Sequence, residues 1–383
     1  MGAFAKLGDM VYLLDNLTGI TWQMLVMWAV GGILIYLAIA KDMEPSLLLP
    51  MGFGAILVNL PFSGAVTQVI EGAIERGPLD ELFDMGIANE LFPLILFIGI
   101  GAMIDFGPLL SNPRMFLIGA AAQFGIFFTL VMARALGFSL TDAASIAIIG
   151  AADGPTSIYV ANYFNTPYIG AILVAAYSYM ALVPIVQPPV IRLCTTKKER
   201  RMRMAYKPHA IAKSTRILFP IVVTVVAGIA SPKSVALVGF LMFGNLIREC
   251  GVLDSLSETA QKVLANLITI FLGLVVATKM QAELFVNWET LMILGLGLVA
   301  FIMDTAGGVF FVKLMNLFSK NKINPMIGAT GISAFPMSAR VIHKMGLKED
   351  PQNHLLMHAI GANVSGQIAS VVAGGVILAL VAR

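Results

Sequence analysis

One carboxylate stands in a helix-breaking stretch that is otherwise apolar. The stretch runs from Ile149 to Ser157 and reads IGAADGPTS, with apolar sequence on both sides. Gly154-Pro155 interrupts a helix, because proline lacks an N–H and its ring clashes with the preceding turn. An Asp at mid-membrane depth costs about 2.5–3.5 kcal/mol on insertion scales, so Asp153 is a candidate functional residue. The alternative is a Pro-kinked helix whose Asp pairs with a basic side chain.

The groups around Asp153 predict a cation site. In a membrane, carbonyl groups freed by a helix break must be buried in protein or line a wet cavity. Open carbonyls, the hydroxyls of Thr156 and Ser157 and one carboxylate are all oxygen ligands, which small hard cations prefer.

A second polar break lies between Ile323 and Met345, and it offers neutral oxygens. The groups expected there come from Asn324, Gly328, Thr330, Ser333 and Ser338, and Asn363 in the last apolar segment adds an amide. Asp153 is the only carboxylate in the combined set. One carboxylate with several neutral oxygens fits a monovalent cation better than calcium, which collects more acidic ligands.

Other polar residues in apolar segments have competing interpretations. Arg340 follows Ser333 by seven residues, about two helical turns, so both are expected to face one cavity. Its guanidinium would hold a carboxylate bidentately, or it snorkels to the interface. His354 and His358 form an incomplete zinc shell, so polar packing or proton handling is expected and no transition-metal site. Asp304, beside small residues, is assigned to helix packing.

The composition indicates a polytopic membrane protein. Of the 383 residues, 58% are hydrophobic and 12% are charged, against about 45–50% and about 25% in soluble domains. No P-loop, dinucleotide fingerprint or HExxH motif occurs, so we expect no nucleotide-binding site that could supply energy and no nucleic-acid partner.

We expect about 10–12 membrane segments, some of which do not cross fully. Thr21–Ala40 is predicted to be a retained transmembrane helix, because it is longer than a signal-peptide core, and Gly64–Gly77 is predicted to be amphipathic and interfacial. The other predicted segments are Ser46–Phe62, Ile87–Ile104, Met115–Leu136, Thr141–Phe164, Tyr168–Ile191, Ile217–Ile229, Val235–Ile247, Val263–Thr278, Leu291–Phe318, Ile323–Met345 and Leu355–Val381.

Two similar halves are predicted on either side of a basic loop. Residues 150–160 align with residues 331–341 at glycine, proline, serine and valine, and broken helices at matching positions are typical of secondary transporters. The predicted organisation is a first membrane repeat with an N-terminal helix (1–191), a basic cytoplasmic loop (192–216) and a second membrane repeat (217–383). The loop is an orientation signal or a docking surface for an acidic partner. Whether the repeat is inverted stays open.

Four stretches carry a family resemblance. GAADGPTSIYVANYF (150–164), VAAYSYMALVPIVQPP (174–189), NPMIGATGISAFPMSARVIHKMG (324–346) and NHLLMHAIGANVSGQIAS (353–370) resemble the beta subunit of the biotin-dependent sodium-pumping decarboxylases, which act on oxaloacetate, glutaconyl-CoA or methylmalonyl-CoA. The resemblance runs from about Gly31 to the C-terminus. It implies that the chain decarboxylates carboxybiotin carried by a partner and exports sodium while consuming a proton.

The resemblance also implies roles for individual residues. The sodium sites would be formed or shaped by Asp153, Asn324, Gly328, Ser333 and Asn363. Tyr179 and Arg340 would take part in proton handling and in the binding of carboxybiotin. The implied fold is all-α, with two repeats broken at the membrane midplane and an elevator-like scaffold plus core.

The partners implied by the resemblance are a carboxyltransferase (alpha) subunit, a biotin-carrier domain or subunit and a small single-span subunit. The chain would form a homotrimer in the cytoplasmic membrane of a bacterium or archaeon. The residues alone indicate a cation-coupled transporter, and a sodium-coupled carboxylate symporter with Arg340 binding substrate is the alternative.

Overall fold

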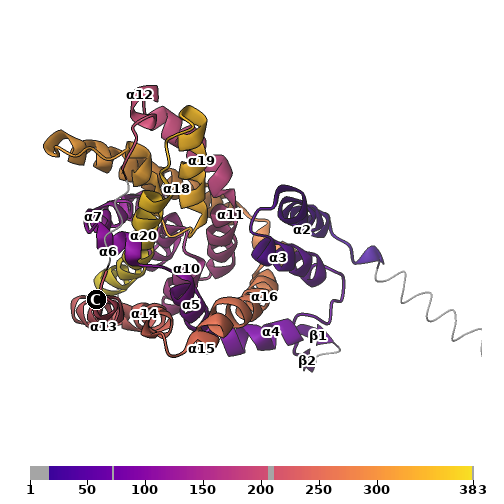
Figure 1. Ribbon diagram of the computed structural model, residues 1–383. Coiled ribbons are helices and arrows are strands. Elements are labelled where there is room, and N and C mark those ends of the chain that lie inside the picture. Colours follow the sequence, from indigo (N-terminus) through magenta and orange to yellow (C-terminus); the bar gives the residue numbers. More distant parts are fainter. Residues whose placement is uncertain (1–16, 71–72, 206–210, 382–383) are drawn as a thin grey trace, which may run out of the picture. The chain divides into compact units, whose positions relative to one another are not determined.

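The computed structural model describes residues 17–70, 73–205 and 211–381, and these residues are almost entirely helical (Figure 1). The chain divides into two compact units. The first contains the chain up to Leu91 together with Thr269–Leu291, and the second contains Phe92–Ile268 and Met292–Arg383.

The first unit is built on a pair of close-packed helices. A Cβ atom on Gly31 would lie 2.6 Å from the carbonyl oxygen of Gly52, so only glycine permits this approach. Asn59 ties the second helix to a later segment, with Nδ2 donating to the Met280 carbonyl at 2.8 Å and Oδ1 accepting from the Ala282 amide at 2.7 Å. The elements are α2 (Trp22–Lys41), α3 (Pro45–Val58), β1 (Gln68–Ile70), β2 (Ala73–Glu75), α4 (Pro78–Phe83), the π-helix η1 (Asp84–Ala88), η5 (Ala277–Lys279) and α17 (Ala282–Phe285).

The segment Gly64–Gly77, predicted to be amphipathic and interfacial, contains two short antiparallel strands. Strands β1 and β2 pair Gln68 with Glu75 and Val69 with Ile74. The β-branched residues Val69, Ile70 and Ile74 favour a pleated strand.

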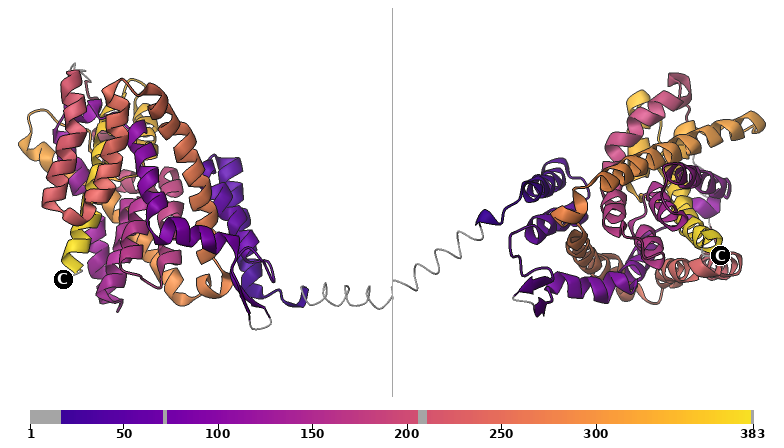
Figure 2. Two further views of the ribbon diagram at one scale, coloured as in Figure 1. Left: turned by 90° about the horizontal axis from the view of Figure 1, so that it is seen from below. Right: turned by 180° about the vertical axis from the view of Figure 1, so that it is seen from behind.

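The second unit is a helical bundle around the last helix, α20 (Leu356–Val381), which contacts helices from distant parts of the sequence (Figures 1 and 2). The other elements are α5 (Leu91–Met103), α6 (Gly107–Ser111), α7 (Arg114–Ala121), α8 (Phe124–Ala135), α9 (Leu140–Ala147), η2 (Ile148–Ala151), α10 (Gly154–Tyr163), α11 (Ile169–Cys194), α12 (Lys197–Arg200), α13 (Lys213–Ala230), η3 (Pro232–Ser234), α14 (Val235–Cys250), α15 (Asp254–Thr259), the π-helix η4 (Ala260–Leu264), η6 (Pro325–Gly331) and α19 (Met337–Glu349). The boundaries between the units fall after the first residue of α5 and within α16 (Ala265–Val276) and α18 (Trp288–Phe318).

Both predicted helix breaks are confirmed. In the first, α9 continues into the 3₁₀ turn η2, Ala152 takes the left-handed conformation at φ 50°, and α10 begins at Gly154. In the second, η6 ends at Gly331, Ile332 is extended, and α19 begins only at Met337. Both breaks lie in the second unit, and both contact α20.

Among the described residues, six helices are long and apolar enough to cross a membrane, and two bent pairs raise this number to eight if each pair is one span. Two shorter apolar helices, Pro45–Val58 and Leu140–Ala151, bring the apolar segments to ten, the lower end of the predicted range. The chain is therefore an all-α polytopic membrane protein.

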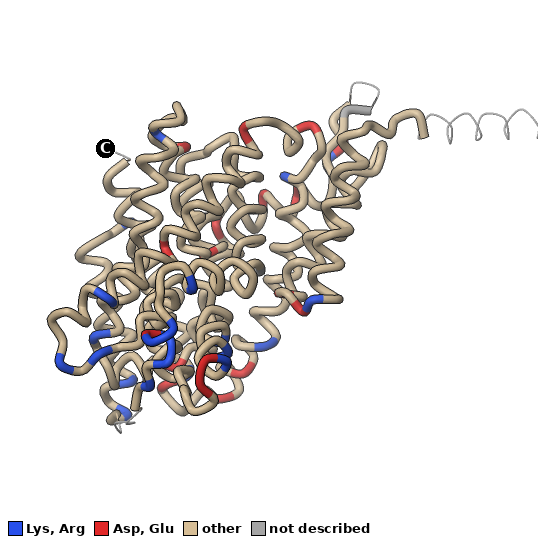
Figure 3. Tube along the Cα trace, turned by 90° about the horizontal axis from the view of Figure 1, so that it is seen from above, with Lys and Arg blue, Asp and Glu red and all other residues tan. Residues whose placement is uncertain are grey.

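Many of the Lys and Arg positions gather toward one side of the Cα trace, with Asp and Glu positions among them (Figure 3). Arg200 pairs with Glu349 at 2.7 Å, so the loop and the end of α19 are side by side. The positive-inside rule associates such a surface with the cytoplasm.

Candidate cation site

Asp153 is the N-terminal cap of α10. Its backbone is extended (φ −127°, ψ 94°), and Oδ1 accepts a hydrogen bond from the Thr156 amide at 3.2 Å. The side chain is buried, with 2% exposure. Because the start of a helix carries partial positive charge, this position favours a carboxylate. The break at Gly154-Pro155 thus both exposes backbone groups and orients the only acid in the motif.

The second oxygen of Asp153 faces α20. Ser370 donates its hydroxyl to Oδ2 at 2.7 Å, and Gln367 donates Nε2 at 3.3 Å. Neither residue was singled out from the sequence. A signal was present, because Asn363, Gln367 and Ser370 are spaced i, i+4, i+7 and so share one helix face.

The two breaks meet beside Asp153. The Ser333 amide donates to the Ala151 carbonyl at 2.9 Å, and the Ser333 hydroxyl donates to Ser370, which in turn donates to Asp153. Asn363 donates Nδ2 to the Ile332 carbonyl at 2.6 Å. The structure therefore brings together three of the five predicted sodium residues.

Open acceptor oxygens remain around this cluster. The Thr156 hydroxyl and Asn363 Oδ1 are buried and have no hydrogen-bond partner among the described residues. Buried polar groups are normally satisfied, so each such atom needs an explanation. Together with the Asp153 carboxylate and the serine hydroxyls, these atoms are hard oxygen donors that fit a small cation.

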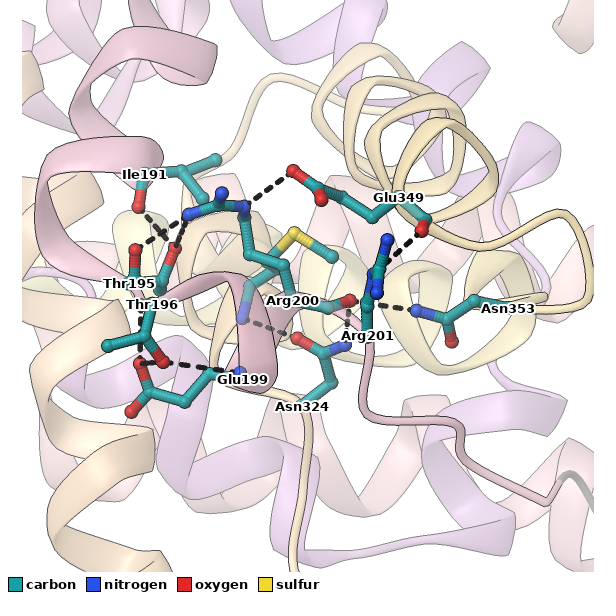
Figure 4. Close-up of polar contacts among 10 residues, drawn as sticks. Ile191, Thr195, Thr196, Glu199, Arg200, Arg201, Asn324, Glu349 and Asn353 are labelled. Atoms are coloured by element: carbon teal, nitrogen blue, oxygen red, sulfur yellow. Dashed lines mark hydrogen bonds and ion pairs between the residues drawn. The ribbon is translucent and has the colours of Figure 1, made fainter.

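Asn324 and Gly328 serve other contacts in this structure. Asn324 caps η6: Oδ1 accepts from the Met326 amide at 3.0 Å, and Nδ2 donates to the carbonyls of Arg200 and Met202 at 3.1 and 2.8 Å (Figure 4). Gly328 lies against Gly308 of α18, where a Cβ atom would overlap the Gly308 carbonyl. These two residues position the second break, and a role in binding sodium stays a prediction.

The predicted catalytic residues form no hydrogen bond with the Asp153 cluster among the described residues. The Tyr179 hydroxyl donates to the Leu294 carbonyl, and its ring packs near Gly297 of α18. Arg340 is exposed on α19 and its side chain has no hydrogen bond or ion pair with any described residue. The helical spacing inferred between Ser333 and Arg340 is wrong, because α19 begins at Met337 and Ser333 lies before it.

Two further buried residues contact the first break. The Tyr177 ring packs on Gly154, where a Cβ atom would overlap it. Asp304 accepts a hydrogen bond from the Gly125 amide through Oδ1. Its Oδ2 has no partner among the described residues and lies against Gly150. Asp304 thus joins helices as predicted, and it also places a second carboxylate beside the break.

A loop clamp, formed by Arg200, Asn324, Glu349 and Asn353, fastens the basic loop to the second break (Figure 4). Both Asn324 and Asn353 donate to the Arg200 carbonyl, at 3.1 and 2.9 Å. The hydrogen bond from the Arg200 guanidinium lowers the pKa of Glu349. The loop therefore does more than orient the chain, since it holds the start of η6 and the end of α19.

The fold and this site define a helical membrane protein with a polar centre at paired helix breaks, which is the organisation of secondary transporters. Residues 23–381 match the family model of the Na+-transporting oxaloacetate decarboxylase beta subunit. The chain belongs to this family, which confirms the resemblance inferred from the four motifs.

The chain is similar to decarboxylase beta subunits named for three different substrates, over nearly the whole length of each. The chain is 49% identical to the glutaconyl-CoA decarboxylase subunit beta of Acidaminococcus fermentans, covering 94% of each protein. It is 48% identical to the methylmalonyl-CoA decarboxylase subunit beta of Propionigenium modestum, over 94% of this chain and 96% of the relative. It is 45% identical to the probable oxaloacetate decarboxylase beta chain of Vibrio cholerae, over 93% and 95%.

Proposed function

We propose that this chain decarboxylates carboxybiotin presented by a partner subunit and uses the reaction to export sodium. The observation that carries the proposal is the Asp153 carboxylate at the meeting point of two helix breaks, within a family of sodium-transporting decarboxylase subunits. Sodium is the cargo, and Asp153, Ser333 and Asn363 supply its ligands, with Asn324 and Gly328 shaping the second break.

The reaction consumes one proton. The bond between the ureido nitrogen of biotin and the carboxylate carbon breaks, CO2 leaves, and the electron pair stays on nitrogen, which takes up a proton. Arg340 binds the carboxylate of carboxybiotin, because a guanidinium offers a planar pair of donors. Tyr179 takes part in proton handling.

The free energy of decarboxylation, and not the hydrolysis of a nucleotide, drives sodium export. Moving one charge against 100 mV costs about 2.3 kcal/mol, and the sequence contains no nucleotide-binding motif. Asp153 binds sodium when ionised and releases it when protonated, so one site serves sodium in one direction and a proton in the other.

The chain acts within a larger assembly. Its partners are a carboxyltransferase (alpha) subunit, a biotin-carrier domain or subunit and a small single-span membrane subunit. The biotin is attached to the carrier. The chain forms a homotrimer in the cytoplasmic membrane of a bacterium or archaeon, and each subunit has a scaffold part and a mobile, elevator-like core.

Decarboxylation of free carboxybiotin by the purified chain tests this function. We expect CO2 release that sodium stimulates. Absence of CO2 release at any sodium concentration would contradict the proposal. Sodium-dependent uptake of a free carboxylate by this chain alone, without decarboxylation, would establish the symporter alternative.

A further inference from the structure

Three cations form one exposed face of α19. Arg340, Lys344 and Lys348 are spaced i, i+4, i+8 and all three are exposed, so they follow one side of the helix at axial steps of about 6 Å. The opposite face, with Val341, Ile342 and Met345, is buried. The row thus leads from the end of α19 next to the second break to the end next to the basic loop.

The carboxylates nearby do not neutralise this row. Glu349 pairs with Arg200 at 2.7 Å, Asp350 pairs with Arg203 at 2.6 Å, and Glu199 pairs with Lys313 at 3.2 Å. Arg340, Lys344 and Lys348 have no ion pair within the part of the chain that the structure describes. Their positive charge is therefore available to a partner.

Helix α12 adds two cations beside α19. Lys197 and Lys198 are exposed, and α12 contacts both α19 and η6. A capping box orders α12: the Thr196 amide donates to Glu199 at 2.7 Å, and the Glu199 amide donates to the Thr196 hydroxyl at 3.3 Å. The loop clamp then holds α12 in place, so these lysines form a fixed surface.

We propose that these five cations form a docking surface for an acidic protein domain that presents the carboxylated ligand to Arg340. We call this surface the α19 cationic face, made of Arg340, Lys344, Lys348, Lys197 and Lys198. The inference rests on the proposed function, and it assigns where the carrier binds and by what chemistry. Complementary charge on the carrier raises the rate of encounter and fixes its orientation.

A membrane surface fits the α19 cationic face less well. A helix that lies on lipid exposes an apolar face beside its cations, whereas the apolar face of α19 is buried in the protein. An orientation signal needs only a count of Lys and Arg in the loops. It does not require the cations to share one face of an ordered helix.

The test compares carrier-bound with free carboxybiotin in the intact complex. In the variant K344E/K348E, we expect the KM for the carboxylated carrier to rise about tenfold or more at low salt, because surface charge acts mainly on encounter rates. The kcat and the rate with free carboxybiotin stay at wild-type values, since neither lysine is needed at the reacting atoms. High salt reduces the difference between variant and wild type.

R114E/K320E is the matched control. It makes the same change in charge with two exposed residues outside α19 and α12. Equal impairment of this control, or an unchanged KM for the carrier in K344E/K348E, would overturn the proposal.

A binding measurement separates this inference from the proposed function. Retention of the uncarboxylated carrier by the complex needs no decarboxylation, so its loss in K344E/K348E supports docking even if wild-type protein fails to release CO2. If K344E/K348E retains the carrier normally but loses binding to vesicles with anionic lipid, the α19 cationic face contacts the membrane and the proposal is wrong.

Discussion

The amide of Ser333 donates to the carbonyl of Ala151 at 2.9 Å, and this hydrogen bond joins the two helix breaks directly. The Ser333 side chain then continues through Ser370 to Asp153. A change at either break therefore reaches the same carboxylate, so both halves of the chain act on Asp153 in the proposed sodium site.

Asp153→Asn is expected to abolish sodium stimulation of decarboxylation. The amide keeps one oxygen but removes the charge that a monovalent cation needs. In wild-type protein, protons compete with sodium for Asp153, so the sodium concentration for half-saturation rises as pH falls. Sodium activation curves at several pH values measure both effects.

Asp304→Asn is the control for this change. Asparagine keeps one oxygen for the hydrogen bond from Gly125, so sodium activation should persist. Normal sodium activation in Asp153→Asn, or a half-saturation that does not move with pH, would show that the shared-site mechanism is wrong.

Ser370→Ala should weaken sodium binding without removing it. The hydroxyl donates to Asp153 at 2.7 Å, so alanine leaves a buried carboxylate oxygen short of one partner, at a cost of about 1–3 kcal/mol. We expect the half-saturating sodium concentration to rise by about tenfold. Ser365→Ala removes a hydroxyl of the same helix that donates to Met115 instead, and sodium affinity should stay constant there.

Arg340→Lys should lose activity although the charge remains, because lysine lacks the planar pair of donors. Sodium affinity should change little. The measurement is kcat and KM for free carboxybiotin together with sodium activation. Wild-type turnover in this variant would favour the interpretation that Arg340 only reaches toward the interface.

Glu349→Gln should release the basic loop. The hydrogen bond from Arg200 holds the pKa of Glu349 below its ordinary value, so the stabilisation is present at neutral pH and is lost as the pH falls through the folded-state pKa. Unfolding of the purified chain should cost about 1–3 kcal/mol less in the variant at pH 7, and this difference should shrink at a pH below the ordinary pKa of a Glu carboxyl, about 4.3. A difference that is equal at both pH values would argue against the ion pair.

The sequence by itself determined the membrane class, the two helix breaks and the presence of a carboxylate, Asp153, at the first of them. These features depend on local sequence. The apolar runs are long enough to span a bilayer, Gly154-Pro155 cannot continue a helix, and the acidic side chain of Asp153 is costly to place in lipid. The motif stretches were long enough to indicate the family that the comparisons confirm.

Only the tertiary structure decided which groups meet. Ser370 and Gln367 reach Asp153 from α20, and Asn324 holds the loop instead of joining that cluster. Arg340 stays on the surface because the helix that carries it begins after Ser333. Spacing along a sequence predicts neighbours only within one regular helix, whereas contacts across a break depend on how α20 packs against both halves.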